Sequence, residues 1–121
     1  MSSLGLWLAV GAIGGAASVL RYVVHGLFPV GMRAGFPVGT LAVNVTGSFV
    51  LGVLVGAAVH GHAYLLAGTA AVGSYTTFST WMLDTERLAR EVRLSRAALN
   101  ISATLAVGRA AAELGRLLAG G

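Results

Sequence analysis

The chain has 121 residues, of which 56% are hydrophobic and only 10% are charged, and its mean hydropathy is +0.83. A soluble domain carries roughly 25% charged residues, so this chain has too few of them to cover a soluble domain's surface. It contains no cysteine, which excludes disulfides and thiolate metal sites. The net charge of +4 comes from arginines, which indicate membrane topology better than they indicate nucleic-acid binding. We therefore expect a membrane protein.

Four long apolar runs predict an all-α membrane protein with four transmembrane helices. No Asp, Glu, Lys or Arg occurs from Ala34 to Leu83, which is room for two spans of about 20 residues each. The runs on either side supply two more, and we treat residues 1–121 as a single domain. The expected helices cover residues 4–28, 38–59, 63–83 and 97–118.

The first expected helix carries two features that face a neighbour or the membrane boundary. Gly11 and Gly15 form a small-xxx-small pair, which favours close approach of another helix. Arg21 lies beside Tyr22 near the end of the apolar run. It is either an arginine that extends to the membrane interface or a cation that attracts an anion to a vestibule.

Polar side chains follow one face of the second expected helix and one face of the fourth. Thr40, Asn44 and Ser48 recur at a spacing of four residues, as do Asn100 and Thr104. An asparagine amide keeps donors and acceptors that its own helix does not satisfy, so Asn44 either lines a site or joins helices. We expect a polar path between these two faces.

The third expected helix is broken near its centre. Residues 73–77, with the sequence GSYTT, combine a flexible glycine with hydroxyl side chains that compete for backbone hydrogen bonds. Non-helical backbone at membrane depth is tolerated only where it is buried in protein or lines a polar cavity. The break therefore predicts a site.

A charged segment, residues 84–96, follows the third expected helix. We interpret it as a solvated helical end or connector that includes Asp84, and it places Glu86 four residues before Arg90, a spacing that favours an ion pair.

Arginines are distributed unevenly between the two sides that four alternating helices define. The uneven distribution places both termini outside. Arg109 and Glu113, on the fourth expected helix, have the spacing of an ion pair. The connections that carry the excess contain Arg33, Arg87, Arg90, Arg93 and Arg96, against Arg116 at the C-terminal end.

Three stretches resemble the signatures of the Fluc/CrcB fluoride channel family. They are GGAASVLRY at 14–22, GTLAVN at 39–44 followed by GSF at 47–49, and GSYTTFSTW at 73–81. The resemblance covers nearly the whole chain. It implies four-helix subunits that form an antiparallel (inverted) dimer in the bacterial plasma (inner) membrane, with two fluoride pathways and a central structural sodium ion.

The resemblance also implies roles for individual residues. Backbone carbonyls of Gly73 and Thr76 would bind the sodium ion, which suits a hard cation. Asn44 matches the pore asparagine of the family, and Phe78 matches the first of two pore phenylalanines, whose positive ring edges face an anion. Further hydroxyl donors are expected at Thr77, Ser79 and Thr80.

Fluoride is small and strongly hydrated, so a pore must replace its water with closely placed donors and still release the ion. Neutral amides, hydroxyls and aromatic edges meet that need better than a buried arginine. We expect passive export of fluoride, with no catalysis. The expected partners are fluoride, a second subunit and the lipid bilayer, with no nucleic acid.

Four positions bear on how many pathways work. Trp81 stands where the family has its second phenylalanine, and Asn100 stands where it has a tyrosine. Gly108 replaces a small or hydroxyl residue, and Thr104 matches a serine. Together with the uneven arginines, these departures leave two assemblies open: a homodimer, or a half-degenerate subunit of a heterodimeric channel.

Two other functions fit the sequence less well. A small multidrug-resistance-type proton antiporter has a similar length, but it needs a membrane carboxylate, and the first expected helix has none. A non-transporting assembly subunit would use the glycines and the break for packing alone.

Overall fold

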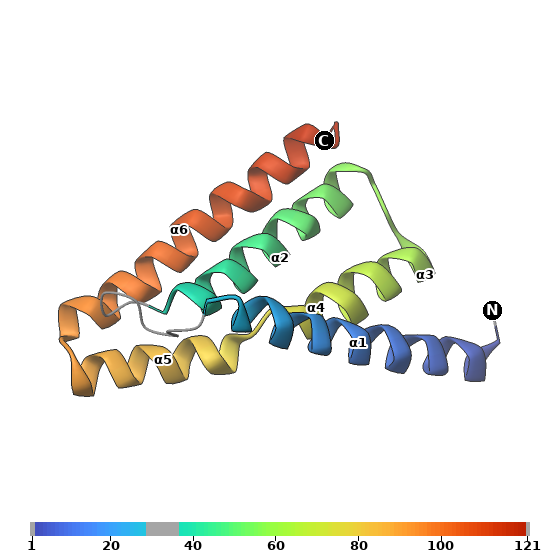
Figure 1. Cartoon of the computed structure of the whole chain (residues 1–121). Helices are drawn as coiled ribbons and strands as arrows, with labels where there is room; N and C mark the ends of the chain where they lie inside the picture. The colour runs from blue at the N-terminus through green and yellow to red at the C-terminus, as the bar shows by residue number, and fades with distance from the viewer. Residues whose placement is uncertain (1, 29–36, 121) are drawn as a thin grey trace.

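The computed structural model describes residues 2–28 and 37–120, and all the regular structure in these ranges is helical (Figure 1). The long helices are α1 (Ser3–Gly26), α2 (Val38–Gly56), α5 (Phe78–Glu91) and α6 (Leu94–Leu118). Between α2 and α5 lie α3 (Gly61–Tyr64), the π-helix η1 (Leu65–Val72) and α4 (Gly73–Tyr75).

Helix α5 continues to Glu91, beyond the end that we expected at Leu83. Of the two alternatives for the charged segment, a helical end or a connector, the structure shows a helical end as far as Glu91. Leu88 is fully buried on the inner side of this helix, and the predicted pair of Glu86 and Arg90 forms on its surface at 3.0 Å. Of the arginines expected in the connections, Arg33 lies outside the described residues.

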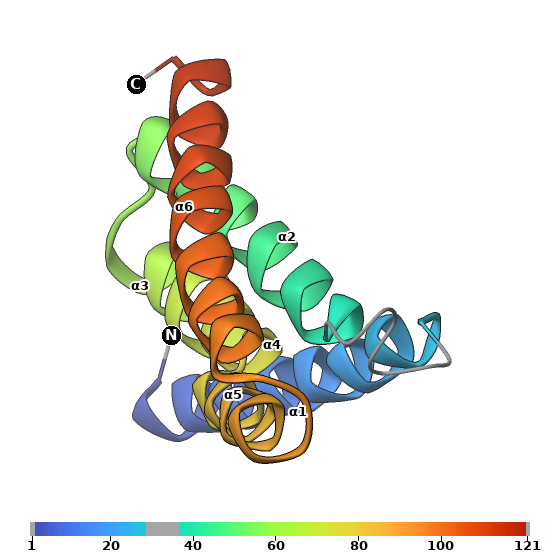
Figure 2. The same cartoon turned by 90° about the vertical axis from the view of Figure 1, so that its left-hand side faces the viewer.

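Helices α2 and α6 run side by side and are in closest contact near their C-terminal ends (Figures 1 and 2). A Cβ atom added to Gly52 of α2 would overlap the backbone carbonyl of Ala112. One added to Gly115 of α6 would overlap the carbonyl of Phe49. Glycine therefore lets the two backbones touch, as small residues do between membrane helices. Toward their N-terminal ends the helices spread apart (Figure 2).

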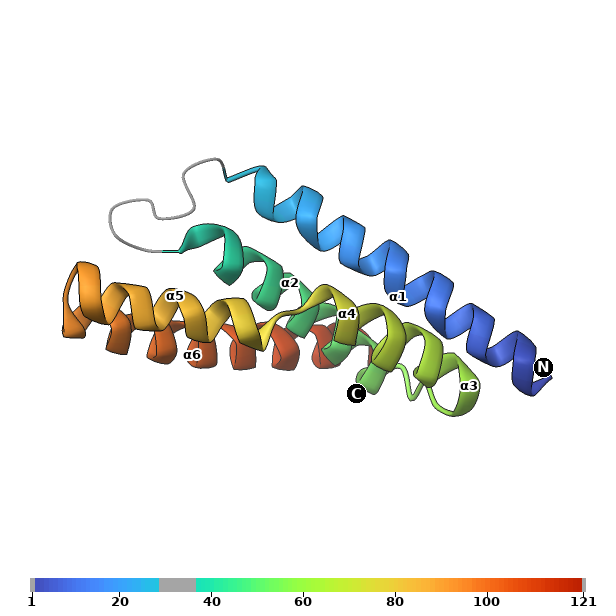
Figure 3. The same cartoon turned by 90° about the horizontal axis from the view of Figure 1, so that it is seen from below.

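Helix α1 packs against η1, α4 and α2 (Figure 3). Gly14 makes its close approach, because a Cβ atom added there would lie 3.1 Å from Oγ of Ser74. Within the described ranges, an added Cβ at Gly11 or Gly15 meets no atom within 4 Å. The close approach that the sequence indicated is thus made by the glycine between them.

Two helices of the described part, α1 and α2, are long and apolar enough to cross a membrane. Large apolar side chains on α1 are exposed, among them Trp7 at 72% and Tyr22 at 80%. An apolar surface of this kind favours contact with lipid or with another subunit.

Candidate functional site

The helical run from η1 to α5 is interrupted at Thr76 and Thr77. Helix α4 ends at Tyr75, and α5 begins at Phe78. Thr76 has a ψ of 161°, and Thr77 has φ −143° and ψ 116°, so both residues have extended backbone (Figure 1). Oγ1 of Thr77 accepts a 3.1 Å hydrogen bond from the N–H of Thr80 and so caps α5.

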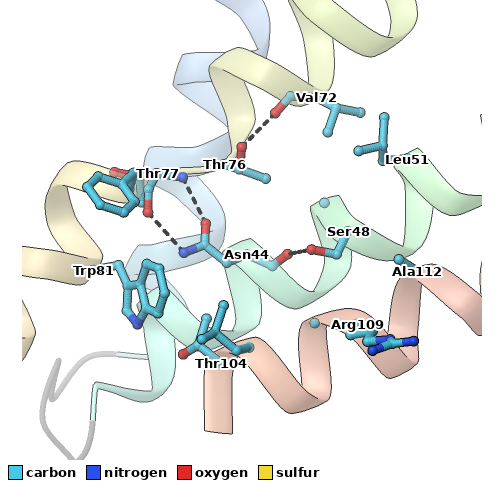
Figure 4. Close-up of a pocket in the computed structure, with 14 residues that line it drawn as sticks. Asn44, Ser48, Leu51, Val72, Thr76, Thr77, Trp81, Thr104, Arg109 and Ala112 are labelled. Carbon is cyan, nitrogen blue, oxygen red and sulfur yellow. Dashed lines mark hydrogen bonds between the residues drawn. The ribbon is translucent and has the colours of Figure 1, made fainter. Parts of the chain in front are cut away.

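The side-chain amide of Asn44 reaches from α2 to the interruption (Figure 4). Its Nδ2 donates to the Thr77 carbonyl at 2.9 Å, and its Oδ1 accepts from the Thr77 N–H at 2.8 Å. Because a carbonyl only accepts and an N–H only donates, the two bonds fix the orientation of the amide. The second Nδ2 hydrogen has no partner in residues 2–28 and 37–120, so Asn44 keeps one donor.

The interruption releases backbone carbonyls from helical hydrogen bonds, among them those of Gly73 and Thr76. In a continuous helix the N–H of Thr77 would bond to Gly73, and the N–H of Thr80 would bond to Thr76. Both N–H groups bond to side chains instead, namely Asn44 and Thr77. Carbonyl oxygens released in this way suit a hard monovalent cation.

A pocket of about 450 Å³ opens beside the interruption, where α2, α5 and α6 spread apart (Figure 4). Arg109 is the charged residue among those that line it, and no carboxylate of the described chain is among them. The pocket brings together six of the predicted pathway residues: Asn44, Ser48, Thr77, Phe78, Trp81 and Thr104.

Two hydroxyls at the pocket already donate to backbone carbonyls four residues earlier in the chain. Ser48 donates to the carbonyl of Asn44 at 2.8 Å, and Thr76 donates to the carbonyl of Val72 at 3.1 Å. In this arrangement Ser48 offers lone pairs rather than a hydrogen. The neutral donors that remain at the pocket come from Asn44, Thr77 and Thr104.

Phe78 and Trp81 form an edge-to-face pair at the pocket, with ring centroids 5.7 Å apart and an interplanar angle of 81°. Phe78 is 69% exposed. The indole N–H of Trp81 donates across to the backbone carbonyl of Asn100 at 3.4 Å, so the extra donor that a tryptophan brings is directed at α6.

Asn100 and Thr104 lie one turn apart on α6 and are buried, at 1% and 7% exposure. Asn100 does not line the pocket. Its Nδ2 donates to Oγ1 of Thr85 at 2.9 Å. In the described part of the chain, Oδ1 of Asn100 and Oγ1 of Thr104 are buried without a hydrogen-bond partner.

Thr40 and Asp84 form a polar contact outside the pocket. Oγ1 of Thr40 donates to Oδ2 of Asp84 at 2.7 Å, and Nε2 of His25 lies 3.3 Å from the same hydroxyl. The expectation that Asp84 is solvated was wrong, because α5 continues through it and turns it inward to 7% exposure.

A helical repeat in the sequence indicates that Asp84 faces inward, although it does not indicate the partner. Thr77, Trp81, Asp84 and Leu88 follow one another at i, i+4, i+7 and i+11, the spacing of a single inward face. We overlooked the repeat because the first charged residue was taken as the end of the helix.

The remaining predicted residues lie around the interruption. Ser79 is exposed, and Thr80 contributes its backbone N–H to the α5 cap; neither side chain lines the pocket. Arg21 reaches from α1 to the carbonyl of Thr76, with Nη1 at 3.4 Å. A carbonyl oxygen has two lone pairs, so this single contact leaves one of them for another partner.

The ion pair predicted between Arg109 and Glu113 was wrong. Glu113 is bonded to Arg116, with Nε to Oε1 at 3.0 Å. The side chain of Glu113 is directed toward the C-terminal end of α6, to Arg116 at i+3. Arg109 lines the pocket instead.

The interrupted helix, the pocket beside it and the exposed apolar surface define a helical membrane protein with an internal polar site. Residues 7–116 match the family model described as "CrcB-like protein, Camphor Resistance (CrcB)". The chain therefore belongs to the CrcB family.

Three similar proteins are named fluoride-specific ion channels. The chain is 50% identical over 119 residues to "Fluoride-specific ion channel FluC 2" of Mycolicibacterium paratuberculosis, which covers 98% of each chain. It is 48% identical over 105 residues to "Fluoride-specific ion channel FluC 1" of Rubrobacter xylanophilus, covering 86% of this chain and 85% of the relative. A FluC 2 protein of Haloarcula marismortui is 44% identical over 97 residues, covering 80% and 79%.

Proposed function

We propose that this protein is a subunit of a fluoride-selective channel that exports fluoride passively from the cytoplasm and crosses the bacterial inner membrane several times. The observation that carries the proposal is the lining of the pocket, where the donors of Asn44, Thr77 and Thr104 are neutral and the charged residue among the described lining, Arg109, is positive. Such a lining favours an anion over a cation. The names of the relatives support fluoride as that anion.

Several residues at the pocket each contribute one weak interaction with a small anion. Asn44 is fixed by two hydrogen bonds to Thr77, so its remaining N–H is held in place without reorganisation. The ring edges of Phe78 and Trp81 add weak positive potential. No single group binds fluoride strongly, which lets the ion leave as easily as it enters.

We propose that two subunits pair in antiparallel orientation around a structural sodium ion. The freed carbonyls of Gly73 and Thr76 would hold the ion, which would supply a positive charge between the subunits. A second cavity of about 380 Å³, with an almost entirely apolar lining that includes Leu20, Val50 and Tyr75, supports a partner surface there. A related chain in place of a second copy is the alternative assembly.

The test is fluoride efflux from liposomes that contain the purified chain, followed with a fluoride electrode. We expect efflux that is selective over chloride and is lost in Asn44→Ala. Val55→Ala, an exposed change on the same helix that lines neither cavity, serves as the matched control. If well-folded protein is silent alone, the chain is reconstituted with a related sequence of opposite arginine distribution. Silence in both preparations would overturn the proposal.

A further inference from the structure

Two buried polar atoms on α6 lack a hydrogen-bond partner among residues 2–28 and 37–120: Oδ1 of Asn100 and Oγ1 of Thr104. The two residues are four positions apart and therefore share one face of the helix. Thr104 lines the pocket, and Figure 4 shows it on the α6 side, below Trp81. Buried polar groups without partners destabilise a fold, so a native protein normally supplies one, often an ordered water.

The hydrogen bonds of Thr85 determine which atom of the Asn100 amide is left over. Oγ1 of Thr85 donates its single hydrogen to the carbonyl of Trp81 at 2.8 Å. It can therefore only accept from Asn100, at 2.9 Å, which places the Asn100 NH₂ group against Thr85. The unpartnered atom is the amide oxygen, which needs a donor.

Thr104 is left with a donor for a related reason. A threonine inside a helix commonly donates to the carbonyl four residues back, which here belongs to Asn100. That carbonyl accepts from the indole of Trp81 at 3.4 Å, and the hydroxyl of Thr104 forms no bond to it. The α6 face thus presents one acceptor and one hydroxyl.

This pair of groups selects among ligands. A bare anion would accept from the Thr104 hydroxyl but would be repelled by the lone pairs of the Asn100 oxygen. A water molecule donates to that oxygen, accepts from the hydroxyl and keeps one hydrogen. We propose that Asn100 and Thr104 bind a resident water that directs its remaining hydrogen to the fluoride pathway. The last step rests on the proposed function, whereas the water site does not.

The first test is a crystal structure of the full chain, grown without fluoride and at a resolution that shows ordered water. Fluoride and water scatter X-rays almost equally, so the fluoride-free crystal is the informative one. We expect density within hydrogen-bond distance of both atoms in the wild type and in Thr104→Ser, and none in Thr104→Val. Density that appears only in a second crystal, grown with fluoride, would identify an anion site and overturn the proposal. The absence of density from both crystals would also overturn it.

The second test measures efflux from liposomes with the same variants, after size-exclusion chromatography confirms that each is folded. Thr104→Val removes the hydroxyl that holds the water beside the fluoride pathway. We expect fluoride efflux to slow about tenfold. Thr104→Ser, which keeps the hydroxyl, should conduct fluoride faster than Thr104→Val. Equal rates in Thr104→Val and the wild type would overturn the role in conduction. A wild type that never conducts would contradict the proposed function, and the density would then decide the water site alone.

Discussion

Oγ1 of Thr40, on α2, donates a 2.7 Å hydrogen bond to Oδ2 of Asp84, on α5, and both side chains are buried. A carboxylate is costly to bury without partners. Asp84 has Thr40 on one oxygen and Arg87 at 3.4 Å on the other. Because Arg87 is half exposed, the short bond from Thr40 is the stronger of the two contacts.

Removing the Thr40 hydroxyl should therefore destabilise the protein. We expect Thr40→Val to lower the free energy of unfolding by about 1.5–3 kcal/mol, the range for a hydrogen bond to a charged group. Thr40→Ser keeps the donor and should stay closer to the wild type. Denaturant unfolding in detergent measures both variants, and equal stability of Thr40→Val and Thr40→Ser would contradict the assigned strength of this bond.

The sequence predicted the site better than it predicted the ends of the helices. Asn44, Thr77 and Thr104 were expected from polar periodicity and from the run of hydroxyl residues, and the structure brings them to one pocket. Asp84 was misplaced because a charge in an apolar chain was taken as a boundary. Burial of that charge depends on a partner 44 positions away, Thr40, which no local pattern specifies.

Side-chain pairing within a helix was also beyond the sequence. Glu113 has arginines at both i−4 and i+3, and spacing alone does not choose between Arg109 and Arg116. The structure pairs it with Arg116. The same limit applies to the glycines of α1. The sequence does not show which of Gly11, Gly14 and Gly15 lies against the neighbouring helix.

Asn44 should stabilise the interruption as well as serve the pocket. Asn44→Ala removes the partner of the Thr77 N–H and one of the two partners of the Thr77 carbonyl, which also accepts in the first turn of α5; Thr77 is buried. Each lost partner costs about 1–3 kcal/mol where water does not replace it. We expect faster amide hydrogen exchange in a peptide spanning residues 73–80, with unchanged exchange at the C-terminal half of α6. Unaltered exchange in that peptide would show that the amide does not hold the interruption.

The contact between α2 and α6 should tolerate no side chain at Gly52. Gly52→Ala places a methyl group into the backbone carbonyl of Ala112, so the helices must separate. Overpacking of this kind typically costs about 1–3 kcal/mol. Gly11→Ala is the matched control, because it meets no described neighbour and replaces a poor helix former by a good one. If Gly11→Ala instead disrupts assembly on size-exclusion chromatography, Gly11 lies against another subunit.

Trp81 offers a test of whether the departures from the family pattern limit conduction. Trp81→Phe removes the 3.4 Å bond to the Asn100 carbonyl, and because that bond is long we expect a loss of stability of about 1 kcal/mol or less. The smaller ring keeps an aromatic edge beside Phe78 and widens the pocket. We therefore expect faster fluoride efflux from liposomes containing this chain alone. A slower rate, in protein that remains folded, would show that the indole contributes to the pathway, and a homodimer with two working pathways would then be favoured over a half-degenerate subunit.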